Sequence, residues 1–371
     1  MTKARTNANI SPAVGRNRVI NGSMNVAQRA TSVTGIGAAA GYFTCDRWDT
    51  YVEATAGRLT ASQTADGPNG ISANCLKFDC TTADASIAAA ESLILRHKFE
   101  GQNLQSVGKG VVGAKQITVS FYVKASATFT FACNLHDIDN NRHITKLFAV
   151  TTDWNRIELT FPADVDDGSS PFDDDNANSL ALQFWLHAGT TYTGGTLQTT
   201  WANYVANTTC AGISSFFSNT ANNFFITGVQ MEVGPVATEF EQEEITTTLT
   251  KCQRYYQKLT GSYAQYGQIA NVSYNTATQA QSAIVYPTEM RAAPTLSYTS
   301  TSSNNSNSAY AIANGSSNSG GVDYIDTLVL YNANAKSTLL YTGNSASGTV
   351  REAGNLYVQS AITELALVAE L

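Results

Sequence analysis

The sequence predicts an all-β protein: a jelly-roll β-sandwich, then a short helix, then a second, smaller β-sandwich domain. Three observations support this class. Two runs of alternating polar and apolar residues stand back to back between residues 116 and 136, a pattern typical of an antiparallel hairpin with one buried face. Further alternating runs recur about every ten residues, with polar turns between them. Helical periodicity is almost absent.

The composition fits a large globular protein with few charges. A chain of 371 residues is long for a single core, so two domains are expected. Hydrophobic residues make up 43% of it, and charged residues only 14%, against ~25% in typical soluble domains. Such a surface must be covered by Ser, Thr, Asn and Gln, which suits polar, uncharged ligands better than ionic ones.

Positive charge is concentrated at the beginning of the chain. Residues 1–45 carry +5 and no acidic residue, so the remainder carries −12 within a net charge of −7. Residues 1–17 are polar and unpatterned, and we expect them to form an arm that becomes ordered when it docks on a partner. Its candidate contacts are Lys3, Arg5 and Arg16. Scattered charges without interleaved aromatic residues argue against nucleic-acid binding.

The cysteines indicate neither a disulfide framework nor a zinc site. They are scattered, with no CxxC motif and no nearby histidine cluster. Buried free thiols made in a reducing cytoplasm are the simplest interpretation. The six are Cys45, Cys75, Cys80, Cys133, Cys210 and Cys252. We also expect no leader peptide and no membrane span, because no apolar run approaches the ~18 residues that a span requires.

The first domain is predicted over residues 18–242. Its hairpin has Val119 and Phe121 on the buried face of one strand and Phe129 and Phe131 on that of the next. A third alternating strand covers residues 180–187, and a closing strand lies within residues 224–240. Gly234-Pro235 then turns the chain out of the sheet.

A helix is predicted over residues 243–259, because the period of the apolar residues changes there. They follow a spacing of 4, 3, 4 and 3: Ile245, Leu249, Cys252, Tyr256 and Leu259. A short connecting helix against its own domain is expected, and a seam between chains is the alternative. The second domain is predicted over residues 260–371, with the Ser/Asn/Gly tract 300–321 as a long loop or exposed hairpin.

Several short stretches together resemble bacteriophage tail fibre and other virion appendage proteins that carry a carbohydrate-binding-module-like jelly roll. They cover residues 17–258 and comprise Asn17–Met24 with Gln28-Arg29, Phe43–Trp48, Leu76–Ser86, Phe99–Gln102, Thr118–Lys124, Gln183–Trp185, Gly228–Pro235 with Ala237–Phe240, and Cys252–Tyr256. The resemblance implies a non-enzymatic virion protein, made in the host cytoplasm, often a homotrimer, that contacts glycans of the host surface. The partners of the arm 1–17 would then be other virion proteins. It supplies no catalytic residue and no cofactor.

A glycan site requires an exposed aromatic ring that stacks on the sugar, flanked by planar polar groups. Trp185, with Gln183 and His187 beside it, supplies these types on one strand. Tyr122, Asn134 and His136 would extend the face if their strands are neighbours. The alternative is that this face packs against another subunit or the second domain, where the same residue types are favoured.

The acidic stretch between residues 164 and 175 could be a Ca²⁺ site or a catalytic site for glycoside hydrolysis. Its members are Asp164, Asp166, Asp167, Asp173, Asp174 and Asp175. Asp173, Asp174 and Asp175 are weak Ca²⁺ candidates, since EF-hand spacing is missing and a solvated turn is commoner. Hydrolysis of glycosides would need two carboxyl groups held across a cleft, which flexible aspartates do not provide. No serine elbow or phosphate loop is present, so we expect no enzyme.

Two functional hypotheses remain from the sequence. The first is a tail fibre, a receptor-binding appendage that contacts host-surface glycans. The second is a purely architectural fibre or decoration protein of head, collar or tail, whose aromatic face is used in subunit packing. The sequence leaves open the host, the glycan and the point of attachment.

Overall fold

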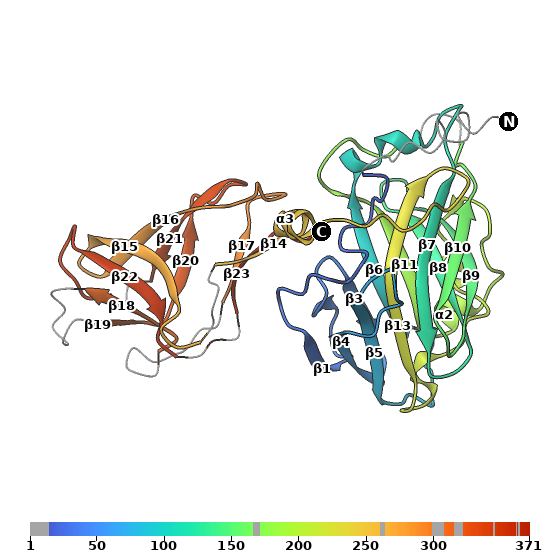
Figure 1. The fold of residues 1–371 in the computed structure, drawn as a ribbon, viewed down its shortest axis with the longest axis horizontal. Coiled ribbons are helices and arrows are strands. Elements are labelled where there is room, and N and C mark those ends of the chain that lie inside the picture. Colours follow the sequence, from blue (N-terminus) through green and yellow to red (C-terminus); the bar gives the residue numbers. More distant parts are fainter. Residues whose placement is uncertain are drawn as a thin grey trace. The chain divides into compact units, whose positions relative to one another are not determined.

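The computed structural model describes residues 15–165, 171–259, 264–298, 308–314, 322–343, 346–360, 362 and 364–371. The chain divides into two compact units, residues 1–248 with Leu371, and residues 249–370 (Figure 1). Both consist mainly of antiparallel sheets, so the predicted all-β class is confirmed. No helix in the described ranges is long and apolar enough to cross a membrane.

The first unit is a sandwich of two sheets. The first sheet has the strand order β1 (Ser32–Ile36), β4 (Arg58–Thr64), β5 (Cys75–Thr82), β13 (Asn223–Val233), β7 (Ile117–Ala125) and β10 (Asn155–Phe161). The second has the order β12 (Ala202–Asn203), β9 (Arg142–Val150), β8 (Phe129–Asp137), β11 (Asn178–Ala188), β6 (Ser92–Glu100), β3 (Asp49–Glu53) and β2 (Gly41–Tyr42). Short helical turns lie in the loops: η1 (Gly101–Asn103), η2 (Gln105–Val107), α2 (Thr190–Thr193), η3 (Ala206–Thr208) and η4 (Phe216–Ser218).

The predicted hairpin of residues 117–136 is wrong in its pairing. β7 pairs with β10 and β13 in the first sheet, whereas β8 pairs with β9 and β11 in the second. The connection between β7 and β8 therefore crosses from one sheet to the other, and their apolar faces meet across the core. Phe121 of β7 lies 4.9 Å from the ring of Phe184 on β11. Alternation shows which face of a strand is buried, but it does not identify the neighbouring strand.

The stretch Phe43–Trp48 clamps the beginning of the first unit onto its core. The Trp48 side chain is buried, and its indole N–H donates to the backbone oxygen of Asn21 over 3.1 Å. The Asp46 carboxylate accepts from the backbone and the side chain of Gln28. A burial of this kind gives these residues a structural role.

The predicted arm of residues 1–17 is only partly described. Lys3 and Arg5 lie outside the described residues, and Arg16 is half-buried. The backbone N–H groups of Gly15 and Asn17 donate to the Glu241 carboxylate over 2.6 and 2.8 Å. The end of the predicted arm is therefore docked on the sandwich.

The helix α3 (Ile245–Gln253) is shorter than the predicted range 243–259. It ends early because Tyr256, Gln257 and Lys258 form a strand that pairs with residues 366–368. Tyr256 and Leu259, two members of the predicted helical stripe, consequently lie beyond the helix. Hydrogen bonds to a neighbouring strand outweigh the local helical period here.

The second unit contains two sheets with a shared hydrophobic core. The smaller has the order β14 (Tyr256–Lys258), β23 (Leu365–Val368) and β17 (Thr295–Tyr298). The larger has the order β19 (Val322–Ile325), β18 (Tyr310–Asn314), β22 (Ala353–Val358), β15 (Gln268–Thr276), β16 (Gln279–Val285), β21 (Ser337–Thr342) and β20 (Leu328–Tyr331). The tract 300–321 is expected from the sequence to form a long loop or an exposed hairpin. It contains β18, which pairs with β19 in antiparallel fashion, but the strand is not exposed, because its Tyr310 and Ile312 side chains are buried. Residues 300–307 and 315–321 lie outside the described ranges.

Candidate functional site

The strand register defines the outer face of the second sheet in the first unit. Gln183 on β11 lies opposite Arg96 on β6 and Asn134 on β8. In the next row, Trp185 lies opposite Ile94 and Ala132. Residues directly opposite one another in an antiparallel pair point to the same face. The structure thus places Trp185, Gln183 and Asn134 on one face, and the condition that the sequence left open for Asn134 is met because β8 and β11 are neighbours.

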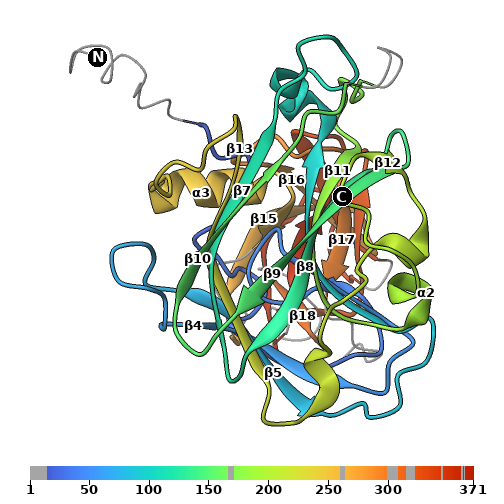
Figure 2. The ribbon, with the colours of Figure 1, turned by 90° about the vertical axis from the view of Figure 1, so that its right-hand side faces the viewer.

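The prediction that Trp185 is exposed is wrong. Its side chain is only 3% exposed, because residues 189–215, called here the covering segment, pass over this part of the sheet. The Trp185 ring lies 5.0 Å from that of Tyr192 and packs with Cys210. Tyr192 belongs to α2, whose ribbon lies beside the second sheet in Figure 2. Its indole N–H donates to Gln183 Oε1 over 2.9 Å. The alternation of β11 predicted the correct face, but what covers that face comes from elsewhere in the chain.

Asn134 is also buried and bonded internally. Its side-chain amide donates to Thr145 Oγ1 over 2.7 Å, within the neighbouring strand β9. His143 of β9 lies beside it and is fully buried, and burial lowers the pKa of His143 to about 4. The polar groups of this row therefore bond to one another inside the protein, and the Asn134 amide is not accessible to a ligand.

His136 is accessible in part and stacks on an aromatic ring. It lies opposite Ala181 on β11, and its ring is 4.6 Å from that of Tyr204, at an angle of 18°. Both side chains are half-buried. Burial lowers the pKa of His136, which favours a neutral imidazole. Tyr204 belongs to the covering segment, so a residue outside the sheet completes this aromatic pair.

A second aromatic group lies on β3 and β6. The Arg96 guanidinium is centred 4.1 Å from the Tyr51 ring, and its Nε donates to Asp49 over 2.9 Å. The Tyr51 hydroxyl donates to Glu53 Oε2 over 2.9 Å, and the Tyr192 hydroxyl lies 3.4 Å from the same oxygen. Burial, with Glu53 beside it, raises the pKa of Tyr192 to about 12. Every one of these tyrosines keeps its proton at neutral pH.

These side chains form one partly exposed surface, which we call the binding face. It consists of Tyr51, Glu53, Arg96, His136, Tyr192 and Tyr204. Sequence reasoning had selected only His136 among them. The outward positions of Tyr51 and Arg96 could have been read from strand alternation, whereas Tyr192 and Tyr204 lie in a segment without strand periodicity.

Tyr122 does not belong to the binding face. It lies on β7 in the other sheet, opposite Arg156 on β10 and Thr227 on β13. Its strand is not a neighbour of β11, so the predicted extension of the site through Tyr122 is wrong. This tyrosine provides a control position on the same domain.

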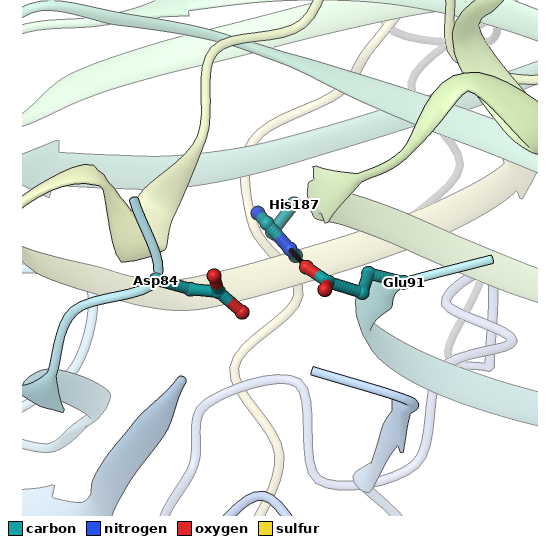
Figure 3. A group of neighbouring side chains, drawn as sticks. All are labelled: Asp84, Glu91 and His187. Atoms are coloured by element: carbon teal, nitrogen blue, oxygen red, sulfur yellow. Dashed lines mark hydrogen bonds and ion pairs between the residues drawn. The ribbon is translucent and has the colours of Figure 1, made fainter. Parts of the chain in front are cut away.

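The His187 side chain does not lie beside Trp185 but next to two buried carboxylates. The register of β11 and β6 shifts between residues 185 and 187, and His187 is fully buried. Its Nε2 lies 3.2 Å from Glu91 Oε2, and Asp84 completes the group (Figure 3). His187 Nδ1 lies 2.8 Å from Ser215 Oγ. The prediction that His187 flanks an exposed ring is therefore wrong.

The acidic stretch contains one buried and several exposed aspartates. Asp164 is buried and pairs with Lys109 and Arg142. Asp173, Asp174 and Asp175 are exposed, and Asp166 and Asp167 lie outside the described residues. Within the described ranges, the group of side chains positioned to hold a metal ion is Asp84, Glu91 and His187, which includes none of the three weak Ca²⁺ candidates.

No protein-family model and no curated protein matches the chain. Solved structures similar to it include carbohydrate-binding modules. A family 4 module (CBM4) has 10% identity and a TM-score of 0.31, over 58% of this chain and 99% of the module. TmCBM61 in complex with β-1,4-galactotriose has 11% identity and a TM-score of 0.30, over 59% and 99%. The CBM22-1 xylan-binding domain of Paenibacillus barcinonensis Xyn10C has 12% identity and a TM-score of 0.28, over 61% and 100%.

These values are too low to carry an argument about function. What the protein binds has to be inferred from its own residues, and these comparisons give no indication of a virion protein. The resemblance to phage appendages stays a prediction from sequence.

Proposed function

We propose that the first unit is a non-catalytic glycan-binding domain and that the whole chain is a receptor-binding appendage of a phage virion, such as a tail fibre. The observation that carries the binding part is the binding face, where aromatic rings and planar polar groups share one partly exposed surface. The virion part is supported by the sequence resemblance over residues 17–258 and by the basic beginning of the chain.

The chemistry of the binding face suits a polar, uncharged sugar. Tyrosine rings offer an apolar surface to the C–H face of a pyranose ring, and their hydroxyl groups bond to water or to sugar hydroxyls. Arg96 is already neutralised by Asp49, so little net charge remains for an ionic ligand. Glu53 orients two tyrosine hydroxyls and can accept from a sugar hydroxyl.

Binding of the purified protein to a glycan array, and then to the selected glycan by calorimetry, tests this proposal. Tyr51→Ala and Tyr204→Ala should each weaken binding about tenfold, because each removes one ring contact worth about 1.4 kcal/mol. Tyr122→Ala, on the other sheet, should leave the affinity unchanged. Equal losses in all three variants, or no bound glycan on the array, would contradict the proposed site. Because the proposed domain is non-catalytic, incubation with the protein should create no new reducing ends in the glycan.

Attachment through the beginning of the chain is tested by deleting residues 1–14. The deletion stops before Gly15, because Gly15 and Asn17 bond to Glu241. We expect a folded protein that no longer joins the virion, measured by mass spectrometry of purified particles. Normal incorporation of the shortened protein would refute the role of Lys3 and Arg5 in attachment.

One surface of the second unit is a candidate contact between subunits, which both the tail-fibre and the architectural hypotheses include. In the second unit, β20 exposes Val329 and Tyr331 on its outer face, beside Tyr341 of β21, and β16 exposes Val285 on the other side of β21. Val285 is 77% exposed, Val329 50% and Tyr331 52%, and the Tyr331 ring stacks on Tyr341 at 5.3 Å. Contiguous exposed apolar surface is typical of protein contacts, and here it is consistent with the homotrimer that the resemblance implies. Val285→Lys with Val329→Lys should then yield monomers in light scattering.

A further inference from the structure

Three ligand-type side chains from separate segments converge at a buried point of the first unit. Asp84 and Glu91 lie in the connection between β5 and β6, and His187 lies near the end of β11. Each is at most 5% exposed, and one potential ligand atom from each lies within 4.8 Å of the other two. Figure 3 shows the two carboxylates approaching from opposite sides, with the imidazole between them. We call this group the histidine–carboxylate cluster.

The positions of these side chains are fixed by backbone contacts. The backbone N–H groups of Gly189 and Thr191 donate to the backbone oxygens of Glu91 and Ala89, each over 2.9 Å. A Cβ atom on Gly189 would lie 1.9 Å from the backbone oxygen of Ala88. The connection that carries Glu91 therefore packs tightly against the end of the strand that carries His187.

The charges of the cluster are incompletely balanced. Among the described residues, His187 is the one basic side chain that pairs with either carboxylate. Asp84 accepts from Thr55 Oγ1 and from the backbone N–H of Ala56, both over 2.8 Å. An ionised carboxylate and a neutral imidazole are the forms in which these groups bind metals.

The distance between His187 and Glu91 also fits a shared cation. The 3.2 Å between His187 Nε2 and Glu91 Oε2 exceeds the ~2.7–2.9 Å of a charge-assisted hydrogen bond. It is close to the ~3.3 Å between two ligands of a tetrahedral ion with bonds of ~2.0–2.1 Å. On the far side of the ring, Nδ1 can donate to Ser215 Oγ over 2.8 Å. Such an outer contact fixes the tautomer that leaves Nε2 free for a metal.

We propose that Asp84, Glu91 and His187 bind one divalent transition-metal ion of the Zn²⁺ class, with water as the fourth ligand. Mixed imidazole and carboxylate ligands favour Zn²⁺ over Ca²⁺ or Mg²⁺. The ion joins the β5–β6 connection to β11. Because His187 precedes the covering segment and Ser215 ends it, the ion also ties down both ends of that segment. This inference does not depend on glycan binding.

Titration of the full chain with Co²⁺, followed by displacement with Zn²⁺, tests the proposal. We expect one equivalent of Co²⁺ with the visible bands of a tetrahedral site, and no thiolate charge-transfer band, since the six cysteines are not ligands. His187→Gln, Glu91→Gln and Asp84→Asn should each weaken Zn²⁺ binding at least a hundredfold. His143→Gln is the matched control, because His143 is equally buried but lies beside Asn134 and Thr208, and it should bind normally. Zn²⁺ should raise the melting temperature of the wild type, and a chelator should reverse that rise.

Three results would overturn the proposal. The first is a wild-type protein that binds no Co²⁺ or Zn²⁺ at micromolar concentration, which would mean that a proton bridges the cluster. The second is stoichiometric binding that persists in His187→Gln. The third result does not need the variants to fold. If X-ray absorption of the Zn²⁺-loaded wild type shows sulfur ligands, or shows no imidazole ligand, the ion is bound elsewhere.

Discussion

Replacing Trp185 with alanine should destabilise the first unit, because the indole ring is part of its packing. The side chain is 3% exposed and fills the space between the sheet and Tyr192 of the covering segment. Removal of a buried Trp costs about 3–5 kcal/mol when the cavity does not collapse. The lost hydrogen bond leaves the buried Gln183 amide oxygen without its donor, which favours the upper part of this range. We therefore expect a loss of about 4 kcal/mol in the free energy of unfolding.

Urea unfolding followed by tryptophan fluorescence measures this loss in one unit alone. All four tryptophans lie before residue 249, so their emission reports the first unit. Trp48, Trp154 and Trp201 remain as probes in the variant. Tyr122→Ala, on the partly exposed face of the other sheet, is the control and should cost about 1 kcal/mol. If Trp185→Ala costs less than about 1 kcal/mol at an unchanged m value, the ring is not part of the packed interior, and Trp185 would return as a candidate ligand contact.

Two further predictions use the same assay. Lys109→Met should cost about 3–5 kcal/mol, since the buried Lys109 ammonium lies 2.8 Å from Asp137; a loss below about 1 kcal/mol would contradict this. Acid should also destabilise the first unit, because burial lowers the pKa of all four histidines, that of His143 to about 4. The unfolded chain then binds protons that the folded chain does not, so stability is full above pH ~6.5 and falls as the pH drops towards 4. His143 alone contributes up to about 3 kcal/mol, and His143→Gln should flatten the dependence measured between pH 7 and 4.5.

The fold class could be predicted from sequence because alternation is a local property. Val119 and Phe121 on β7, like Phe129 and Phe131 on β8, point into the core as their spacing indicates. The partners of these strands could not be predicted, because a short turn serves equally to continue a sheet or to cross to the opposite one. This single ambiguity explains why Tyr122 was assigned to the face of Trp185.

The binding face was harder to predict than the fold, since half of its rings come from the covering segment. Tyr192 and Tyr204 stand in a stretch without periodicity, held by backbone contacts such as Cys210 N–H to Tyr192 O over 3.0 Å and Tyr204 N–H to Asn141 O over 2.7 Å. Contacts of this kind join residues far apart in the sequence and leave no pattern in it. The same segment buries Trp185, so the residue with the strongest sequence signal for a sugar contact supports the surface from beneath. Tyr51, Tyr192 and Tyr204 are then the rings that remain available to a ligand, and their arrangement depends on how firmly the covering segment is held at His187 and Ser215.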